Sequence, residues 1–420
     1  MHRVKINKNI FIQSIIFVTS ILILFRSVNR TISDYDSYRR GAKLILNDFI
    51  NVIDKLPYDS SWGNFENRGS NGPIWLLFIS PFELVPYTPA IILFRLVVII
   101  SLFILIKKIA TELEFNRDLL VLFSFVIMLF PFRFLVNTSQ GSTIAYLVGV
   151  YSLILLLKEN LRSIDFFLIG FAIVLCINYK PHLFIPFTVW LFVNKKIKII
   201  LSALIIGTVL EFILYFNAPN STQLSWLKYL LARSDHIDQA SYQLKYGPLT
   251  LIYEFFKLNT TWIYIISFLM IFMMGFYFNK IPCNFRSGLT AMSLGVFIGP
   301  YSPTHDQTLI ALIFGIIFVN YNLRNKSNIL VFLPLLFWIY PSEFTILKQL
   351  IIFLVYAMIV LFLSNFMNFF IFTMLFIVNE CFFFNWLNSD SIYIVTGLGA
   401  LFTLPFINQF QTLTFKNNKI

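Results

Sequence analysis

The sequence predicts an all-α fold, a polytopic bundle of transmembrane helices with about 12–14 spans. The 420-residue chain is 58% hydrophobic and only 12% charged, and that charged share is half of the roughly 25% that a soluble domain needs to cover its surface. Apolar runs of about 17–20 residues recur along the chain, which is the length that crosses a hydrocarbon core of about 30 Å. Lys and Arg residues punctuate these runs on alternate sides, as the positive-inside rule requires.

The apolar runs define the expected spans. The first, 9–26, has no small-residue cleavage site after it, so we expect an uncleaved span and not a signal peptide. The other candidate spans are 91–106, 119–136, 141–157, 164–178, 183–194, 197–216, 261–278, 287–300, 305–320, 328–340, 346–363, 366–380 and 391–408.

The basic residues determine the expected orientation. Arg3, Lys5 and Lys8 precede the first span, which places the amino terminus in the cytoplasm. The loops then predicted inside carry Lys or Arg, whereas the short outer loops near 137–140 and 301–304 carry neither. This pattern predicts a multi-pass protein of the plasma (inner) membrane, with both termini cytoplasmic and the active site on the outer, periplasmic face. The net charge of +12 is spread over these loops, so we expect no nucleic-acid partner.

The chain is expected to form one integral membrane domain, 1–420, with two excursions on the outer side. The first outer loop, 27–90, contains an amphipathic stretch, 38–53, that suits a helix lying at the membrane interface. Its last part, 73–90, holds four prolines and a glutamate, which predicts a re-entrant or surface-lying segment that does not cross. The second outer loop is 217–259.

Four short polar clusters lie on the same side of the membrane in this map. They are 33–36, 137–140, 179–182 and 302–306. Because the rest of the chain is almost uniformly apolar, we expect its chemistry where these clusters converge.

Several residues in or near the clusters have chemistry of their own. Asp34 and Asp36 follow the first span, where a carboxylate can deprotonate a hydroxyl or cap the helix that follows. Arg133 lies near the outer end of its span. Its planar guanidinium group can bind a phosphate, and a side chain that extends to the membrane interface explains its position almost as well. Lys180 is the one basic residue that breaks the charge rule among the short outer loops, which suggests that function retains it.

A late span opens with His305 and Asp306. Adjacent residues rarely face each other, so His305 is taken as the candidate and Asp306 is set aside. Gln140 supplies a neutral hydrogen-bond donor and acceptor. The sequence shows no metal-ligand spacing, glycine-rich phosphate loop or Ser-His-Asp order. We therefore expect neither a metal nor a cofactor.

These motifs resemble those of the multi-span GT-C glycosyltransferases, and most closely glycosyltransferase family 87, the polyprenyl-phosphate-mannose-dependent mannosyltransferases. Asp34 followed by Tyr38 resembles the family's Asp-x-x-x-Tyr element after the first span. The resemblance extends over about residues 10–320. Further similarities, in the family's order, are the prolines of 73–89, Asn137 to Gln140 at a helix start, Lys180-Pro181 after a short span, and Ser302-Pro303 with His305 at the head of a late span.

The sequence also departs from the family pattern at two places. The family usually has a glycine before the glutamine, whereas this chain has Ser139-Gln140-Gly141. In the first outer loop, Asn71-Gly72-Pro73 stands where an aromatic-Pro pair is usual.

The resemblance implies a GT-C-like fold and an inverting hexosyltransferase. Asp34 would be the catalytic base that takes the proton of an acceptor hydroxyl, while cationic side chains stabilise the departing lipid phosphate. The implied partners are a polyprenyl-phosphate-sugar donor such as the mannose form, a glycolipid or glycan acceptor, and membrane lipids. The residues expected to bind substrate or phosphate are Asp36, Tyr38, Arg133, Gln140, Lys180, His182 and His305.

Two other functions stay open at this stage. An O-antigen-type polymerase or ligase would also act on the outer face, and the four basic residues of 217–259 are compatible with it, although such enzymes usually carry an Arg-rich outer loop. A lipid-linked glycan flippase or transporter usually shows internal repeats and polar residues at the midplane. Here the polar clusters lie at span ends, which favours an interfacial enzyme.

Overall fold

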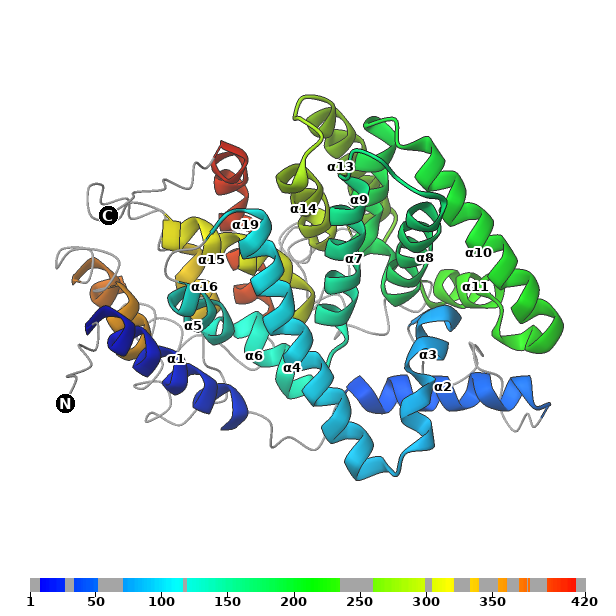
Figure 1. Cartoon of the computed structure of the whole chain (residues 1–420), viewed down its shortest axis with the longest axis horizontal. Helices are drawn as coiled ribbons and strands as arrows, with labels where there is room; N and C mark the ends of the chain where they lie inside the picture. Colours follow the sequence, from blue (N-terminus) through cyan, green and yellow to red (C-terminus); the bar gives the residue numbers. More distant parts are fainter. Residues whose placement is uncertain are drawn as a thin grey trace.

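The computed structural model describes residues 8–26, 34–51, 71–115, 119–234, 260–298, 304–320, 333–339, 354–360, 370–375, 377 and 391–412. Every regular element in these ranges is a helix (Figure 1), so the all-α prediction is confirmed. The α-helices are α1 (Lys8–Arg26), α2 (Asp34–Phe49), α3 (Pro73–Ile79), α4 (Tyr87–Glu112), α5 (Leu119–Met128), α6 (Phe130–Thr138), α7 (Ser142–Leu156), α8 (Ser163–Tyr179), α9 (Pro181–Val193), α10 (Ile197–Asn217), α11 (Gln223–Ser234), α13 (Thr260–Asn279), α14 (Phe285–Ser293), α15 (Thr308–Asn320), α16 (Leu333–Ile339) and α19 (Ser391–Thr412). The 3₁₀ helices are η2 (Ser80–Leu84), η3 (Pro219–Ser221), η6 (Leu294–Phe297) and η7 (Thr304–Gln307).

Two of the described helices, α4 and α10, are long and apolar enough to cross a membrane on their own. Eight further apolar helices in the described ranges have 10–17 residues. Helix α10 carries apolar side chains on its outside, and Phe212 and Phe216 are 60% and 76% exposed. Soluble proteins rarely present a continuous surface of this kind to water. This face of α10 therefore suits contact with lipid.

Most helices lie where the apolar runs predict them, with two interruptions. The expected span 119–136 is divided into α5 and α6, and Pro131 lies in the first turn of α6. A proline is tolerated at this position because a backbone N–H in the first turn would have no acceptor within the helix. The expected span 287–300 is likewise divided into α14 and η6. Within 73–90 the chain forms α3 and η2, and α4 already begins at Tyr87. Much of the candidate spans 328–340, 346–363 and 366–380 lies outside the described residues.

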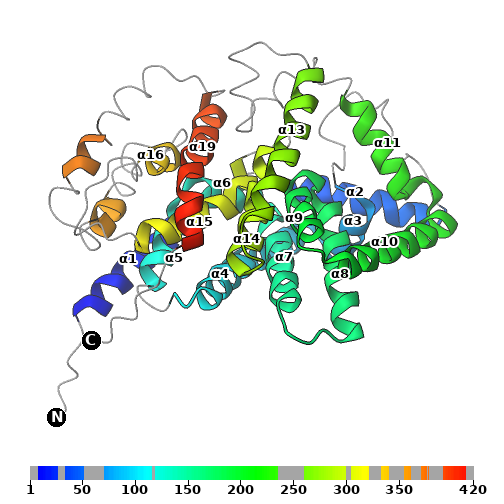
Figure 2. The same ribbon diagram turned by 90° about the horizontal axis from the view of Figure 1, so that it is seen from above.

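Helix α15 is buried along almost its whole length. Every side chain from Thr308 to Val319 is buried, as expected of a helix that is apolar on all sides. It packs against α5, α7 and α19, and Figure 2 shows it among these helices from above. Because η7 leads directly into α15, Asp306 lies at the buried N-terminal end of that helix. The helix dipole favours a negative charge at this position.

Helix α2 lies crosswise beside the ends of α7 and α8 (Figure 1). Its buried side chains, Tyr35, Tyr38, Ala42 and Ile45, follow helical spacing and form one apolar face. The amphipathic helix predicted from residue 38 is thus present and begins four residues earlier, at Asp34.

A buried carboxylate joins α2 to η3. Asp48, in the last turn of α2, is 1% exposed. It accepts hydrogen bonds from the Asn220 backbone N–H (3.0 Å), the Asn220 amide (3.1 Å) and the Ser221 hydroxyl (2.7 Å) in η3. These contacts fix α2 against the segment that connects α10 with α11.

Replacement of this carboxylate should destabilise the protein. Asp48→Ala leaves the Asn220 and Ser221 donors buried without their acceptor, and a buried unsatisfied group costs about 1–3 kcal/mol. We expect a lower thermal unfolding midpoint in detergent, with a smaller loss for Asp48→Asn, which keeps one acceptor oxygen. Glu112→Ala, at an exposed position, is the control. An unchanged midpoint for Asp48→Ala would contradict the stabilising role of these contacts.

Candidate functional site

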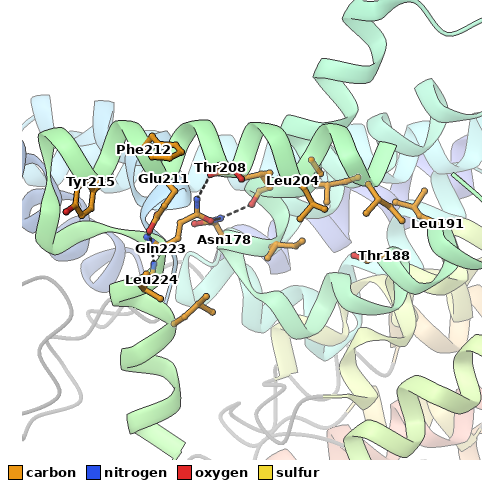
Figure 3. Close-up of a pocket in the computed structure, with 17 residues that line it drawn as sticks. Asn178, Thr188, Leu191, Leu204, Thr208, Glu211, Phe212, Tyr215, Gln223 and Leu224 are labelled. Carbon is orange, nitrogen blue, oxygen red and sulfur yellow. Dashed lines mark hydrogen bonds between the residues drawn. The ribbon is translucent and has the colours of Figure 1, made fainter. Parts of the chain in front are cut away.

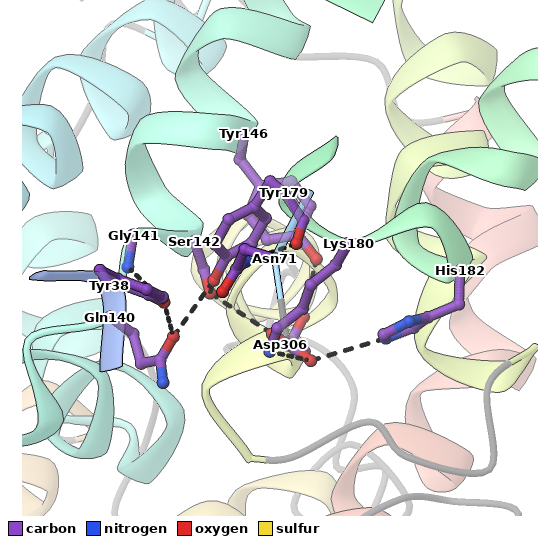
Figure 4. Close-up of polar contacts among 10 residues, drawn as sticks. All are labelled: Tyr38, Asn71, Gln140, Gly141, Ser142, Tyr146, Tyr179, Lys180, His182 and Asp306. Atoms are coloured by element: carbon purple, nitrogen blue, oxygen red, sulfur yellow. Dashed lines mark hydrogen bonds and ion pairs between the residues drawn. The ribbon is translucent and has the colours of Figure 1, made fainter. Parts of the chain in front are cut away.

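The site is built around the corner between α8 and α9. Lys180 is extended there, with φ −155° and ψ 106°, as expected for the residue before a proline, and Pro181 opens α9. The Lys180 ammonium lies 2.8 Å from Asp306 Oδ1 and 2.9 Å from Oδ2 (Figure 4). Lys180 is 9% exposed and Asp306 is fully buried. An ion pair therefore joins this corner to the head of α15.

Three further groups surround the Asp306 residue. The Ser142 hydroxyl donates to Oδ1 at 3.4 Å, and the Tyr146 hydroxyl donates to the Asp306 backbone carbonyl at 2.8 Å. His182 Nε2 lies 3.7 Å from Oδ2, which is beyond hydrogen-bond distance. This nitrogen has no hydrogen-bond partner in the described part of the chain. A buried imidazole nitrogen thus lies directly beside the ion pair.

A second arm of the network leads to Gln140. The Ser142 and Tyr179 hydroxyl oxygens lie 2.7 Å apart, and either can donate to the other. The Tyr179 hydroxyl can alternatively donate to Gln140 Oε1, at 3.3 Å. The Tyr38 hydroxyl donates to the same oxygen. Figure 4 shows these side chains as one continuous set. The network joins α2, the α6–α7 turn, the α8–α9 corner and η7, so segments far apart in the sequence meet at one place.

The α6–α7 turn has an unusual backbone at Ser139. Its φ of 53° lies in the left-handed region, which few residues other than glycine adopt. Arg95 Nε on α4 donates to the Ser139 hydroxyl at 2.7 Å, and this contact holds the turn in place. The turn ends α6 and directs Gln140 into the network.

The segment Asn71-Gly72-Pro73 docks on the C-terminal end of α8. The Gly72 N–H donates to the Asn178 carbonyl at 2.6 Å, and the Asn71 amide donates to the Tyr179 carbonyl at 2.5 Å. In return, Asn178 Oδ1 accepts from the Ile74 N–H in the first turn of α3 at 3.2 Å. The carbonyls at the end of α8 and an N–H at the start of α3, which have no partner within their own helices, are thereby hydrogen-bonded.

This docking places Trp75 between two tyrosines of the network. Its ring centroid lies 4.6 Å from that of Tyr179 and 6.5 Å from that of Tyr38. Gly141 lies directly against the indole, and a Cβ there would come within 2.5 Å of a ring carbon. The close approach explains why this chain has glycine after Gln140. Trp75 thus restricts where the two phenols can lie.

A separate polar group lies at the start of α2. Asp36 accepts a hydrogen bond from the Tyr87 hydroxyl at 2.6 Å, and Arg39 pairs with Glu83 at 2.6 Å. Burial raises the pKa of the Glu83 carboxyl, and the Arg39 charge opposes that shift. Burial also raises the pKa of Tyr35 to about 12, so its phenol is neutral at physiological pH. These contacts hold α2 against η2 and α4.

The predicted site residues fall into three groups. Arg133 is buried on α6, which packs against η7, and Asp36 contacts Tyr87 outside the network. The side chains of Asp34 and His305 lie outside the described residues. The structure brings four of the predicted residues together in one network: Tyr38, Gln140, Lys180 and His182.

Asp306, which the sequence analysis set aside, lies at the centre of the network. One feature of the sequence indicated Asp306. It is an acidic residue at the start of an otherwise apolar run, on the same predicted side of the membrane as Lys180, which breaks the charge rule. A buried lysine needs a counter-charge. Ser142, Trp75 and Tyr179 had no signal of this kind, since serine and aromatic residues are common throughout this sequence.

The network is suited to anions and sugar hydroxyls. Lys180 and His182 can donate to a phosphate, and Gln140 and Tyr38 offer neutral donors and acceptors. Over the ranges that the structure describes, no three His, Cys, Asp or Glu side chains form a group that could hold a metal ion. Fold and site together define a helical membrane protein with a polar, water-shielded site.

Comparison with known families identifies the class of enzyme. The model of glycosyltransferase family 87 matches residues 70–298, more than half of the chain, and the chain belongs to this family. It is therefore a membrane glycosyltransferase, with a sugar donor and an acceptor as substrates. The match is narrower than the 10–320 of the expected resemblance, and it includes Gln140 and Lys180 but not Asp306. No curated protein and no solved structure matches the chain.

The buried ion pair should show strong coupling. Lys180→Met or Asp306→Asn alone leaves one charge buried without its partner, which costs about 3–5 kcal/mol. The double variant removes both charges, so its free energy of unfolding should be higher than that of either single variant. Denaturant unfolding in detergent micelles measures this difference. Losses that simply add in the double variant would contradict direct coupling.

Proposed function

We propose that the protein transfers a hexose such as mannose from a polyprenyl-phosphate donor to a hydroxyl of a glycolipid or glycan on the outer face of the plasma membrane. The observation that carries the proposal is the buried Lys180–Asp306 pair with His182 beside it. The pair is joined to the Gln140 network through Ser142. Lys180, His182 and Gln140 lie within the family match, whereas Asp306 lies beyond its end. A fixed cation in a water-shielded site is suited to the charge that grows on a departing phosphate.

In the proposed reaction the acceptor oxygen attacks C1 of the donor sugar on the face opposite the phosphate. The bond between C1 and the phosphate oxygen breaks, its electron pair leaves with polyprenyl phosphate, and the configuration at C1 inverts. The acceptor proton passes to the carboxylate of Asp34, the general base. Lys180 and His182 bind the phosphate, with Arg133 and His305 supplying further positive charge or hydrogen bonds.

The register of α2 supports Asp34 as the base. Tyr38 lies four residues further along this helix and donates to Gln140. Positions four apart share a helix face, so position 34 is on the face that meets the network. Asp36 is two residues on, about 200° around the helix, and it binds Tyr87.

We further infer a topology in which α2, η2 and α11 lie on the outer side of a bundle of about 12–14 spans. Residues 27–90 and 217–259 are then the two outer loops of a single membrane domain, and both termini are cytoplasmic. The basic residues of the predicted inner loops support this orientation.

Substitution of the proposed base should abolish transfer without unfolding the protein. Losing a positioned general base costs about 10²–10⁴-fold in rate, so Asp34→Asn should insert normally and show a loss of that size. Transfer of labelled mannose from polyprenyl-phosphate mannose in membranes measures the rate. Mass spectrometry of glycolipids from a complemented deletion strain reports the native product whatever its sugar.

Asp36→Asn is the matched comparison. It keeps an oxygen that can accept from Tyr87, so its loss of rate should be far smaller than that of Asp34→Asn. A larger loss of rate for Asp36→Asn than for Asp34→Asn would show that Asp34 is the wrong assignment for the base. Full activity of both variants would overturn the acid–base mechanism.

The topology can be tested with impermeant thiol reagents on intact cells. Cys283 is exposed in the turn before α14, on the predicted inner side, and should react only after permeabilisation. Leu84 in η2 is 85% exposed, and Leu84→Cys in a Cys283→Ser, Cys381→Ser background should react from outside. Cys176 is buried and serves as an internal reference. The reverse labelling pattern would invert the proposed topology.

A further inference from the structure

Two apolar grooves open on the described part of the helical bundle. The α8–α10 groove has a cavity volume of about 650 Å³ and lies between α8, α9, α10 and α11 (Figure 3). The α13–α19 groove has a cavity volume of about 480 Å³, with walls from α13, η6 and α19. Both volumes fall in the range of ordinary ligand sites, about 300–1,000 Å³. They differ in how each groove is placed relative to Lys180 and His182.

Polar contacts close the α8–α10 groove at the end nearest Lys180. Asn178, two residues before Lys180, donates to Gln223 Oε1 at 3.5 Å, and the Gln223 amide donates to the Gly207 carbonyl at 3.1 Å (Figure 3). Glu211 accepts from the Gln223 backbone N–H at 2.7 Å. A chain lying in this groove would therefore meet a hydrogen-bonded barrier before it reached the site.

The α13–α19 groove is in contact with the site through η6. Leu294 and Phe297 form part of its wall, and Gly295 lies between them. A Cβ at Gly295 would overlap the backbone of Leu183, so η6 and the start of α9 touch directly. Leu183 follows His182. The wall of this groove thus lies against the segment that carries the imidazole.

Hydrogen bonds join the walls of the α13–α19 groove at its other end. The Tyr277 hydroxyl donates to Asn408 at 3.2 Å. One turn further on, the Gln411 amide of α19 donates to the Thr290 hydroxyl of α14 at 2.7 Å. Helix α14 leads from this end towards η6 and the site. The walls of the groove are therefore held together at the end away from His182.

The lining of the α13–α19 groove suits a long, flexible hydrocarbon. Met270, Met273 and Met274 all face it, and methionine side chains adapt to irregular apolar shapes. Leu269 is 52% exposed and Met273 is 65% exposed, so the groove is open sideways, where a lipid chain can enter. The twelve residues from Ile266 to Tyr277 extend over about 16 Å of helix, enough for the first part of a prenyl chain.

We propose that the α13–α19 groove binds the prenyl chain of the donor lipid next to its phosphate, while Lys180 and His182 bind the phosphate itself. This inference rests on the proposed function, because it takes polyprenyl phosphate as the lipid. It assigns the chain to this groove and not to the larger α8–α10 groove. The protein then recognises the length of the prenyl chain independently of the sugar.

The test uses two sugar-free probes on the purified full-length protein: undecaprenyl phosphate and the short-chain citronellyl phosphate. Met270→Trp fills the groove. We expect its Kd for undecaprenyl phosphate to rise about tenfold or more, with a much smaller change for citronellyl phosphate, whose chain is too short to fill the groove. Leu404→Trp, from the α19 wall, should do the same. An unchanged unfolding midpoint verifies that both variants are folded.

Gly207→Phe in the α8–α10 groove is the matched control. A Cβ at Gly207 meets only Val174, at 3.7 Å, so a larger side chain can enter that groove without a backbone clash, and neither Kd should change. Lys180→Met should weaken both probes equally. A loss of long-chain affinity in Gly207→Phe alone, or displacement of undecaprenyl phosphate by equimolar phosphatidylglycerol, would overturn the groove assignment.

The outcomes separate this inference from the proposed function. If Lys180→Met weakens both probes while Met270→Trp and Leu404→Trp leave the long-chain preference intact, the phosphate site stands and the groove assignment is wrong. If the wild-type protein binds neither probe, the proposed donor class and the groove assignment both fall.

Discussion

The buried ion pair between Lys180 and Asp306 is the interaction on which the rest of the site depends. Desolvating two charges costs several kcal/mol for each ion, and only close geometry with additional hydrogen bonds repays it. Here both carboxylate oxygens lie within 2.9 Å of the ammonium, and Ser142 adds a third donor. The pair joins the α8–α9 corner to the head of the buried helix α15. Displacement of either residue would move both elements.

The remaining geometry follows from how α3 is docked. The reciprocal hydrogen bonds between Asn71-Gly72 and the end of α8 fix α3 at the same corner that carries Lys180. Trp75 then separates Tyr38 from Tyr179 and leaves both hydroxyls pointing to Gln140. The proline-rich segment 73–89 thus has a positional role, since its helices α3 and η2 pack against α2 and α3 also packs against α8.

Patterns within short stretches of the sequence predicted the features that depend on local interactions. The apolar runs predicted most helix positions, and the conflict with the charge rule singled out Lys180. Sequence reasoning missed the break at Pro131, because a proline in a first turn leaves the apolar pattern unchanged. It also missed the partners of Lys180 and Tyr38: the Lys180–Asp306 contact joins residues 126 positions apart. Contacts of that separation depend on tertiary packing and leave no periodic pattern in the sequence.

The charge balance of the site suits the proposed reaction. With Lys180 paired to Asp306, the empty site does not bury an uncompensated positive charge, which would be costly in a water-shielded interior. A sugar phosphodiester brings one negative charge, and breakage of its C1–O bond adds another to the phosphate. If Lys180 and His182 bind this phosphate as proposed, their interactions with it strengthen as the bond breaks, which is the condition for lowering the barrier and not merely binding the substrate. Because Asp306, Ser142 and the corner at Pro181 already hold Lys180 in place, little reorganisation accompanies that step.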